Sequence, residues 1–207
     1  ANNLNVKDII GLDKELLLTM SSDIQGEGLN KQDADLEVNF DIDKLKIDNN
    51  EFKDFSITGA IENQKLMAST DIDSKLLDLD FNALMDVSAD VPSFEILMNV
   101  KDANLYALNI LDYDKICNFS TSAKANIRGL KLDEMYGDIS LENTSFVDSR
   151  GTYIMDSLNV VLTENYFDSK DIDINCDFFD ADLKGIVNFK GLTNSFKNYV
   201  MNHFHVN

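Results

Sequence analysis

Apolar and polar side chains alternate along residues 55–85. Two polar groups, at residues 62–65 and 73–75, divide this stretch into three segments. Because neighbouring side chains on a β-strand point to opposite faces, a period of two predicts strands. We therefore expect three consecutive antiparallel strands, which form a sheet with one apolar face and one acidic face.

The same alternation recurs along most of the chain. It predicts an all-β fold of roughly ten to twelve strands with polar turns. Further strands are expected at residues 14–28, 36–42, 94–100, 117–129, 139–141, 154–162, 172–178 and 181–189.

The alternation changes parity at two places. After Ile42 the apolar positions continue at Leu45 and Ile47, which lie on the opposite parity. A slip of one residue is typical of a β-bulge, and bulges bend a sheet. A second slip precedes Ala181.

Helical spacing occurs at three places. Residues 4–13 predict a short helix or an irregular lead-in, residues 101–108 predict one helical turn with Asp102 near its start, and an amphipathic helix is expected from Leu192 onward. The predicted organisation is a lead-in at residues 1–13, a repeating antiparallel β segment at residues 14–190, and an amphipathic helix and tail at residues 191–207.

The apolar face of the predicted sheet carries the candidate functional residues. Each of them belongs either to a packed core or to a ligand-facing groove. The candidates are Val38, Phe40, Ile57, Ile61, Leu66, Ile72, Leu77, Leu79, Phe81, Ile96, Met98, Phe119, Ile127, Ile139, Leu141, Leu158, Val160, Ile172 and Ile174.

Charge and composition exclude some partners. The formal net charge of −19 produces a field that repels phosphate, so we expect no binding to nucleic acid or to anionic headgroups.

The 207 residues, of which 44% are hydrophobic, suffice for a substantial core. No apolar run approaches the ~20 residues of a membrane span, and the first residues do not predict a signal peptide. We expect the sequence to be a segment of a longer protein.

The sequence offers little for catalysis. His203 and His205 lie near the C-terminus, where exposed tail residues are expected, and no phosphate loop, nucleophile elbow or zinc motif occurs. Aspartates that alternate along two strands lack the spacing of a calcium loop. Cys117 and Cys176 are expected to be buried as small apolar residues, with a bridge between them as the alternative. No enzymatic activity, cofactor or metal is expected.

Four stretches matter together, in this order: LDFNALMDV at 79–87, VPSF at 91–94, DANLYAL at 102–108 and ADLKG at 181–185. They resemble the repeating region of the TamB family of translocation and assembly module proteins, within the AsmA-like superfamily. YGDISLEN at 136–143 also resembles that family's recurring strand after a glycine. The likeness covers roughly residues 14–200, and Ala83 stands where the family pattern has glycine.

The resemblance implies an envelope protein of a diderm bacterium that is anchored in the inner membrane and crosses the periplasm. It implies a long curved antiparallel sheet that forms a U-shaped open groove, or β-taco, in which the candidate residues contact phospholipid acyl chains. It also implies a link to outer-membrane biogenesis through a β-barrel assembly partner of the full-length protein.

Two other functions remain open from the sequence. In one, the sheet is a scaffold for outer-membrane protein translocation and assembly, and receives unfolded strands by β-augmentation. In the other, the chain is a closed β-sandwich or a cell-surface module with an ordinary core.

Overall fold

The computed structural model of the chain describes residues 4–5, 16–28, 30, 32–47, 50–108, 110–111, 114–130, 134–164 and 169–185. Most of the expected lead-in and the whole expected helix at 191–207, with His203 and His205, lie outside the described residues. Residues 4–5 form a short strand rather than the helical or irregular lead-in expected there.

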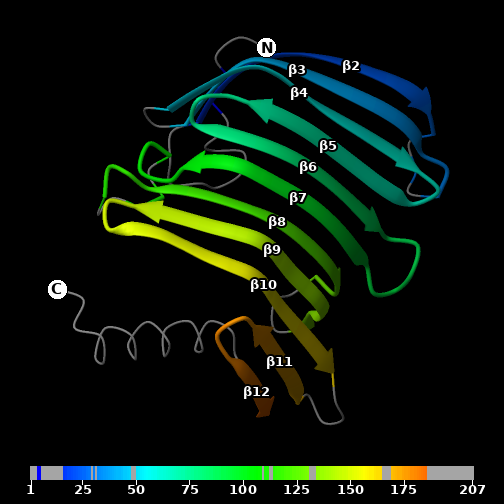
Figure 1. The fold of residues 1–207 in the computed structure, drawn as a ribbon. Coiled ribbons are helices and arrows are strands. Elements are labelled where there is room, and N and C mark those ends of the chain that lie inside the picture. The colour runs from blue at the N-terminus through cyan, green and yellow to red at the C-terminus, as the bar shows by residue number, and fades with distance from the viewer. Residues whose placement is uncertain are drawn as a thin grey trace.

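The described strands form one twelve-stranded antiparallel sheet, in which each strand pairs with the next in the chain (Figure 1). The first and last strands do not pair with each other, so the sheet is not closed. The all-β prediction is thereby confirmed. The strands are β1 (Leu4–Asn5), β2 (Leu16–Glu27), β3 (Asp35–Ile47), β4 (Asn50–Glu62), β5 (Lys65–Asp73), β6 (Leu77–Asp86), β7 (Ser93–Asn104), β8 (Asn118–Arg128), β9 (Tyr136–Asp148), β10 (Gly151–Glu164), β11 (Lys170–Cys176) and β12 (Asp180–Gly185).

Short polar turns connect neighbouring strands. Between β4 and β5, Asn63 and Gln64 both have positive φ, 50° and 62°. Positive φ at both central residues characterises a type I′ turn, whose twist matches that of the two strands. Between β9 and β10 the Asp148 carboxylate accepts hydrogen bonds from the backbone N–H groups of Arg150 at 2.8 Å and Gly151 at 3.2 Å.

A line of irregularities crosses the sheet at one height, and we call it the crease. The partner register shifts between Thr19 and Met20 in β2, and Asp54 has a φ of 56° in β4. The line continues through shifts after Asp78 in β6 and after Val100 in β7, and Asn143 in β9 has a φ of 51°. An extra residue in one strand bends that strand. The bulge predicted after Ile42 is confirmed as part of this line.

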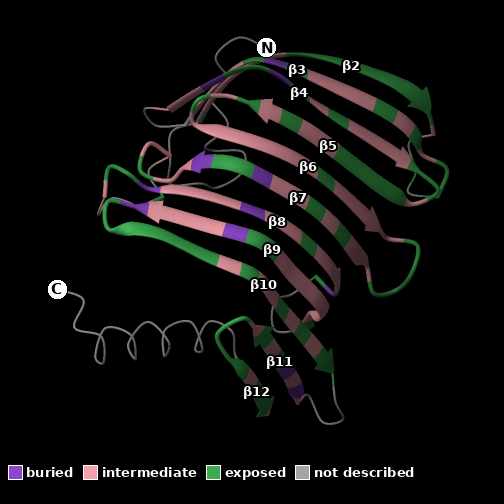
Figure 2. Ribbon diagram, viewed as in Figure 1, coloured by how far each residue is buried: buried purple, intermediate pink, exposed green. Residues whose placement is uncertain are grey.

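Deep burial is concentrated at the crease (Figure 2). Ile42, Phe52 and Phe55 form a buried cluster against which Leu18, Leu45 and other partly buried residues pack. Val100, Ala103 and Cys117 are also buried, and the hydroxyl oxygens of Thr121 and Thr144 lie 2.8 Å apart in a buried hydrogen bond. Bending brings apolar side chains from both sides of the crease together, which removes them from water.

Two expectations are corrected at the ends of strands. Strand β7 continues through Asp102, and the helical turn starts at Asn104, whose carbonyl accepts from the Leu108 N–H at 2.9 Å. The side chain of Asn104 caps this turn because its Oδ1 accepts from the Ala107 N–H at 2.8 Å. Strand β11 ends at Cys176 rather than at the expected residue 178, and the second parity slip falls in the hairpin between β11 and β12.

Candidate functional site: the apolar face of the sheet

The strand register places apolar residues in rows across the sheet. Residues directly opposite each other on paired strands share a face. One row crosses eleven strands, β2 to β12, and all of its members are apolar or glycine. It runs through Ile24, Val38, Gly59, Ala68, Ala83, Ile96, Ala125, Ile139, Val160, Ile174 and Ala181.

All nineteen candidate residues lie on this same face of the sheet. Leu66 is exposed, Ile172 is buried, and the others are half-buried. The structure thus brings them together on one surface. Their contact with lipid stays a prediction.

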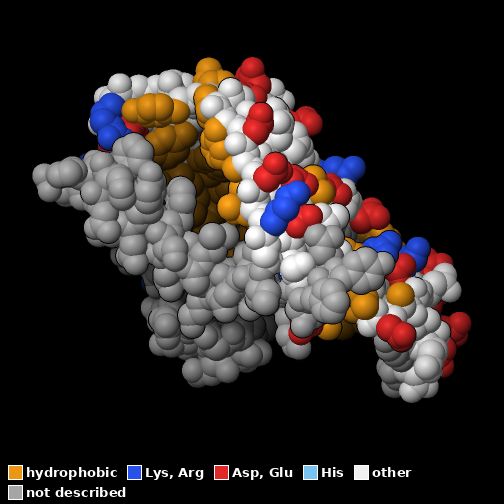
Figure 3. All heavy atoms as spheres, turned by 90° about the horizontal axis from the view of Figure 1, so that it is seen from below, with side chains coloured by type: hydrophobic (Ala, Val, Ile, Leu, Met, Phe, Trp, Pro, Cys, Tyr) orange, Lys and Arg blue, Asp and Glu red, His pale blue; other side chains and the backbone are white. Residues whose placement is uncertain are grey.

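The described residues form no second layer over this face. Most of its side chains retain some exposure. Figure 3 shows hydrophobic side chains gathered in a hollow, while many of the Asp, Glu, Lys and Arg side chains in that view lie on the outer surface. A closed sandwich, in which two sheets pack face to face, does not fit this arrangement.

Residues with small side chains, or with none, occupy the middle of the apolar face. Gly59, Ala68 and Ala83 are direct neighbours across β4, β5 and β6. A Cβ atom built at Gly59 would meet the Met67 carbonyl oxygen at 3.5 Å and no other atom within 4 Å. The larger side chains of Ile57 and Phe81 flank this strip in the next row. Side chains along this three-strand strip, which we call the shallow channel, are therefore shorter than those of Ile57 and Phe81 in the next row.

The opposite face is polar and acidic. Asp71 and Asp80 face each other across β5 and β6, and the Lys101 Nζ lies 3.3 Å from an Asp80 oxygen and 3.1 Å from Asp78. The hydrogen bond with Asp80 raises the pKa of Asp71. The hydrogen bonds from Asp71, Asn99 and Lys101 lower the pKa of Asp80. These carboxyl groups keep this side of the sheet hydrated.

Neither Cys117 nor Cys176 forms a disulfide bond, so the alternative of a bridge between them is wrong. Cys117 is fully buried, as expected. Cys176 is only half-buried because it lies on the apolar face opposite Leu158. Within the described ranges, no group of His, Cys, Asp and Glu side chains could hold a metal ion, and no helix is long and apolar enough to cross a membrane.

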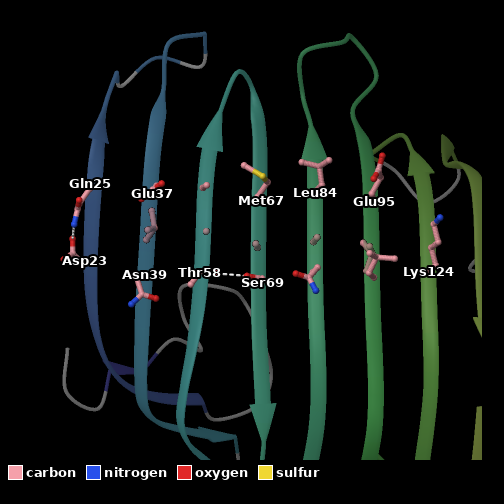
Figure 4. A pocket seen from close by; sticks show the side chains of 18 of the residues that line it. Asp23, Gln25, Glu37, Asn39, Thr58, Met67, Ser69, Leu84, Glu95 and Lys124 are labelled. Carbon is pink, nitrogen blue, oxygen red and sulfur yellow. Dashed lines mark hydrogen bonds between the residues drawn. The ribbon is translucent and has the colours of Figure 1, made fainter.

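Sequence reasoning missed a concave site on the polar face, which we call the outer trough. Its volume is about 690 Å³ and its lining comes from strands β2 to β8 (Figure 4). The sequence does carry a signal for this site: Met67, Leu84 and Leu97 are apolar residues at positions whose side chains lie on the polar face. The alternation in residues 55–85 had suggested a uniformly polar face.

Comparison with known proteins gives no relative. The sequence matches no protein-family model and no curated protein, and the structure matches no solved structure.

Proposed function

We propose that this chain is a non-catalytic segment of a bridge-like periplasmic protein, which carries phospholipid between the inner and outer membranes along an apolar groove. The observation that supports the proposal most is the apolar row that crosses eleven strands without interruption. In most folded proteins a packed core covers an apolar surface of this extent. Where such a surface stays exposed, it marks a binding site.

The groove has its closed side at the crease, and acyl chains lie along the apolar face. Each CH₂ group that leaves water contributes about 0.8 kcal/mol, so the two acyl chains of a phospholipid together favour the groove over water. Headgroups remain at the open side in water. Similar residues recur from strand to strand, so adjacent positions along the groove have similar free energies and the lipid can slide between them.

The cellular setting rests on the resemblance to the TamB family. The full-length protein would be anchored in the inner membrane of a diderm bacterium, and this segment would span part of the periplasm. Repetition of one strand unit is a physically simple way to extend such a groove, because each strand contacts only its neighbours.

A scaffold for outer-membrane protein assembly is the second candidate, and a free strand edge favours it. Strand β1 pairs only with Leu17 and Leu18 of β2. The outward edge of β2 from residue 21 to residue 27 therefore has no strand partner among the described residues. An unpaired edge can receive an extended segment by β-augmentation.

Native mass spectrometry of the purified chain, followed by organic extraction, tests the proposal. Co-purified phospholipid supports lipid transfer. Bound peptide without lipid would favour the scaffold, and the absence of both would contradict the groove.

Photo-crosslinking then locates the lipid. A photoreactive residue at position 79 or 81, on the apolar face, should capture phospholipid from vesicles. The same residue at position 80 or 82 faces the other side and should capture none, which controls for proximity to the vesicle. Equal capture at both parities would overturn the assignment of the lipid to the apolar face.

A further inference from the structure

The outer trough lies on the face of the sheet opposite to the proposed groove. Its volume of about 690 Å³ falls within the usual range of ligand sites, roughly 300–1,000 Å³. A second hollow of about 280 Å³ shares Asn82, Leu97 and Lys124 with it, so the concavity continues toward β9. A twisted sheet is saddle-shaped, which explains how both faces can be concave.

The centre of the trough is apolar. Met67 and Leu84 face each other across β5 and β6, and Leu97 follows on β7. Met67 is 41% exposed and Leu97 is 51% exposed, although both are large apolar side chains. Methionine adapts its shape readily and is frequent on surfaces that bind apolar side chains of a partner.

Acidic side chains surround this centre. Asp23, Glu37 and Glu95 contribute carboxylates, and Lys124 is the cation that lines the trough with them (Figure 4). Within the described part of the chain, Glu37 and Glu95 form no ion pair. The trough thus combines an apolar centre with uncompensated negative charge on rigid strands.

We propose that the outer trough binds a basic amphipathic segment of a partner protein. The apolar side chains of that segment contact Met67, Leu84 and Leu97, and its Lys or Arg side chains lie beside Glu37 and Glu95. The charge of the trough selects this occupant. A second copy of the chain would bring the same carboxylates and a net charge of −19, and anionic headgroups would also be repelled.

A binding assay with synthetic peptides tests the site. The probe is a fluorescein-labelled 12-residue peptide of alternating Lys and Leu, measured by fluorescence anisotropy against the full chain. We expect saturable binding that weakens with salt, and weaker binding of a Lys/Ser peptide of the same charge. The variants M67S/L97S and E37Q/E95Q should each reduce affinity roughly tenfold, because each removes one of the two kinds of contact.

The matched control is D90N/E164Q, which removes the same number of charges at exposed positions outside the trough. It should retain binding within about twofold. Circular dichroism verifies that all variants are folded, which is expected because the altered side chains are largely solvent-exposed or at the surface.

Four results would overturn the proposal. If D90N/E164Q lost as much peptide affinity as E37Q/E95Q, or if the Lys/Ser peptide bound as tightly as the Lys/Leu peptide, general charge attraction alone would explain the binding. Binding of anionic vesicles that M67S/L97S abolishes would assign the trough to lipid. A concentration-dependent dimer in analytical ultracentrifugation that M67S/L97S abolishes would assign it to a second copy of the chain.

Discussion

Phe55 and Phe81 lie on the same face of the same sheet but in different environments. Phe55 is 9% exposed at the crease, where it packs with Ile42 and Phe52. Phe81 is half-buried on the open limb, by which we mean the apolar face of β4 to β8 away from the crease. The bulges bring side chains together at the bend, whereas over the limb the described residues place no facing layer.

The contrast suggests that two parts of one apolar face have different roles. The crease supplies the packed contacts that stabilise the fold, and the open limb retains apolar surface that folding does not use. Proteins are only marginally stable, so the small buried cluster at the crease is expected to contribute a large fraction of the total free energy of unfolding.

The largest expected effect is a loss of stability at the crease. Phe52→Ala removes a side chain that is 5% exposed and should lower the free energy of unfolding by about 3–5 kcal/mol. Phe81→Ala on the limb should cost less than half of that, because its side chain already contacts water. Urea unfolding followed by circular dichroism measures both. Equal losses would contradict the division between crease and limb.

A charge on the limb should separate lipid binding from folding. In Phe81→Glu the carboxylate can stay hydrated, so the variant should remain folded with a loss of about 1 kcal/mol, while co-purified phospholipid disappears. Native mass spectrometry gives the lipid content and urea unfolding gives the stability. Unfolding of the variant would indicate a sealed core at Phe81 and would exclude the open groove.

Filling the shallow channel should act on lipid alone. Ala68→Leu adds a large side chain between Gly59 and Ala83, where Ala68 is exposed, and should change stability by only about 0.5 kcal/mol. The lipid content should fall because the acyl chain loses its path. Ser56→Leu, at an exposed position on the polar face, is the control and should leave the lipid content unchanged.

Much of the fold follows from local pattern. Alternation of apolar and polar residues identified most of the strands, and the polar group at residues 62–65 identified a turn that the structure contains. Because each strand pairs with its neighbour in sequence, no long-range choice of partner had to be made. The face shared by the nineteen candidate residues follows from the same parity.

The crease and the outer trough could be predicted only in part. The slip after Ile42 revealed one bulge, but the alignment of several bulges into one line depends on the register of all strands together. Parity also assigned Met67 and Leu97 to a polar face without showing that they meet. A cross-strand neighbour lies many residues away in the chain, so spacing along one strand cannot reveal it.

The smallest expected effect concerns the polar face, where Asp71 and Asp80 repel each other. The pKa of Asp71 is raised in the folded protein, so the ionised pair destabilises the fold above that pKa and the cost disappears as the pH falls and Asp71 takes up a proton. Asp71→Asn should therefore increase the melting temperature at pH 7, with a gain that shrinks toward the usual titration range of aspartate, near pH 4.

Asp41→Asn is the matched control for this pair, because Asp41 faces Ser21 and Ser56 instead of a carboxylate. It removes the same charge and should show no comparable gain at pH 7. The hydrogen bonds from Asp71, Asn99 and Lys101 lower the pKa of Asp80, so its stabilising contacts are lost as the pH falls through that lowered value, and Asp41→Asn leaves all three partners in place. Melting curves from pH 3 to pH 8 separate the two effects. An equal gain in both variants would mean that the general negative charge of the face destabilises the fold, rather than the pair formed by Asp71 and Asp80.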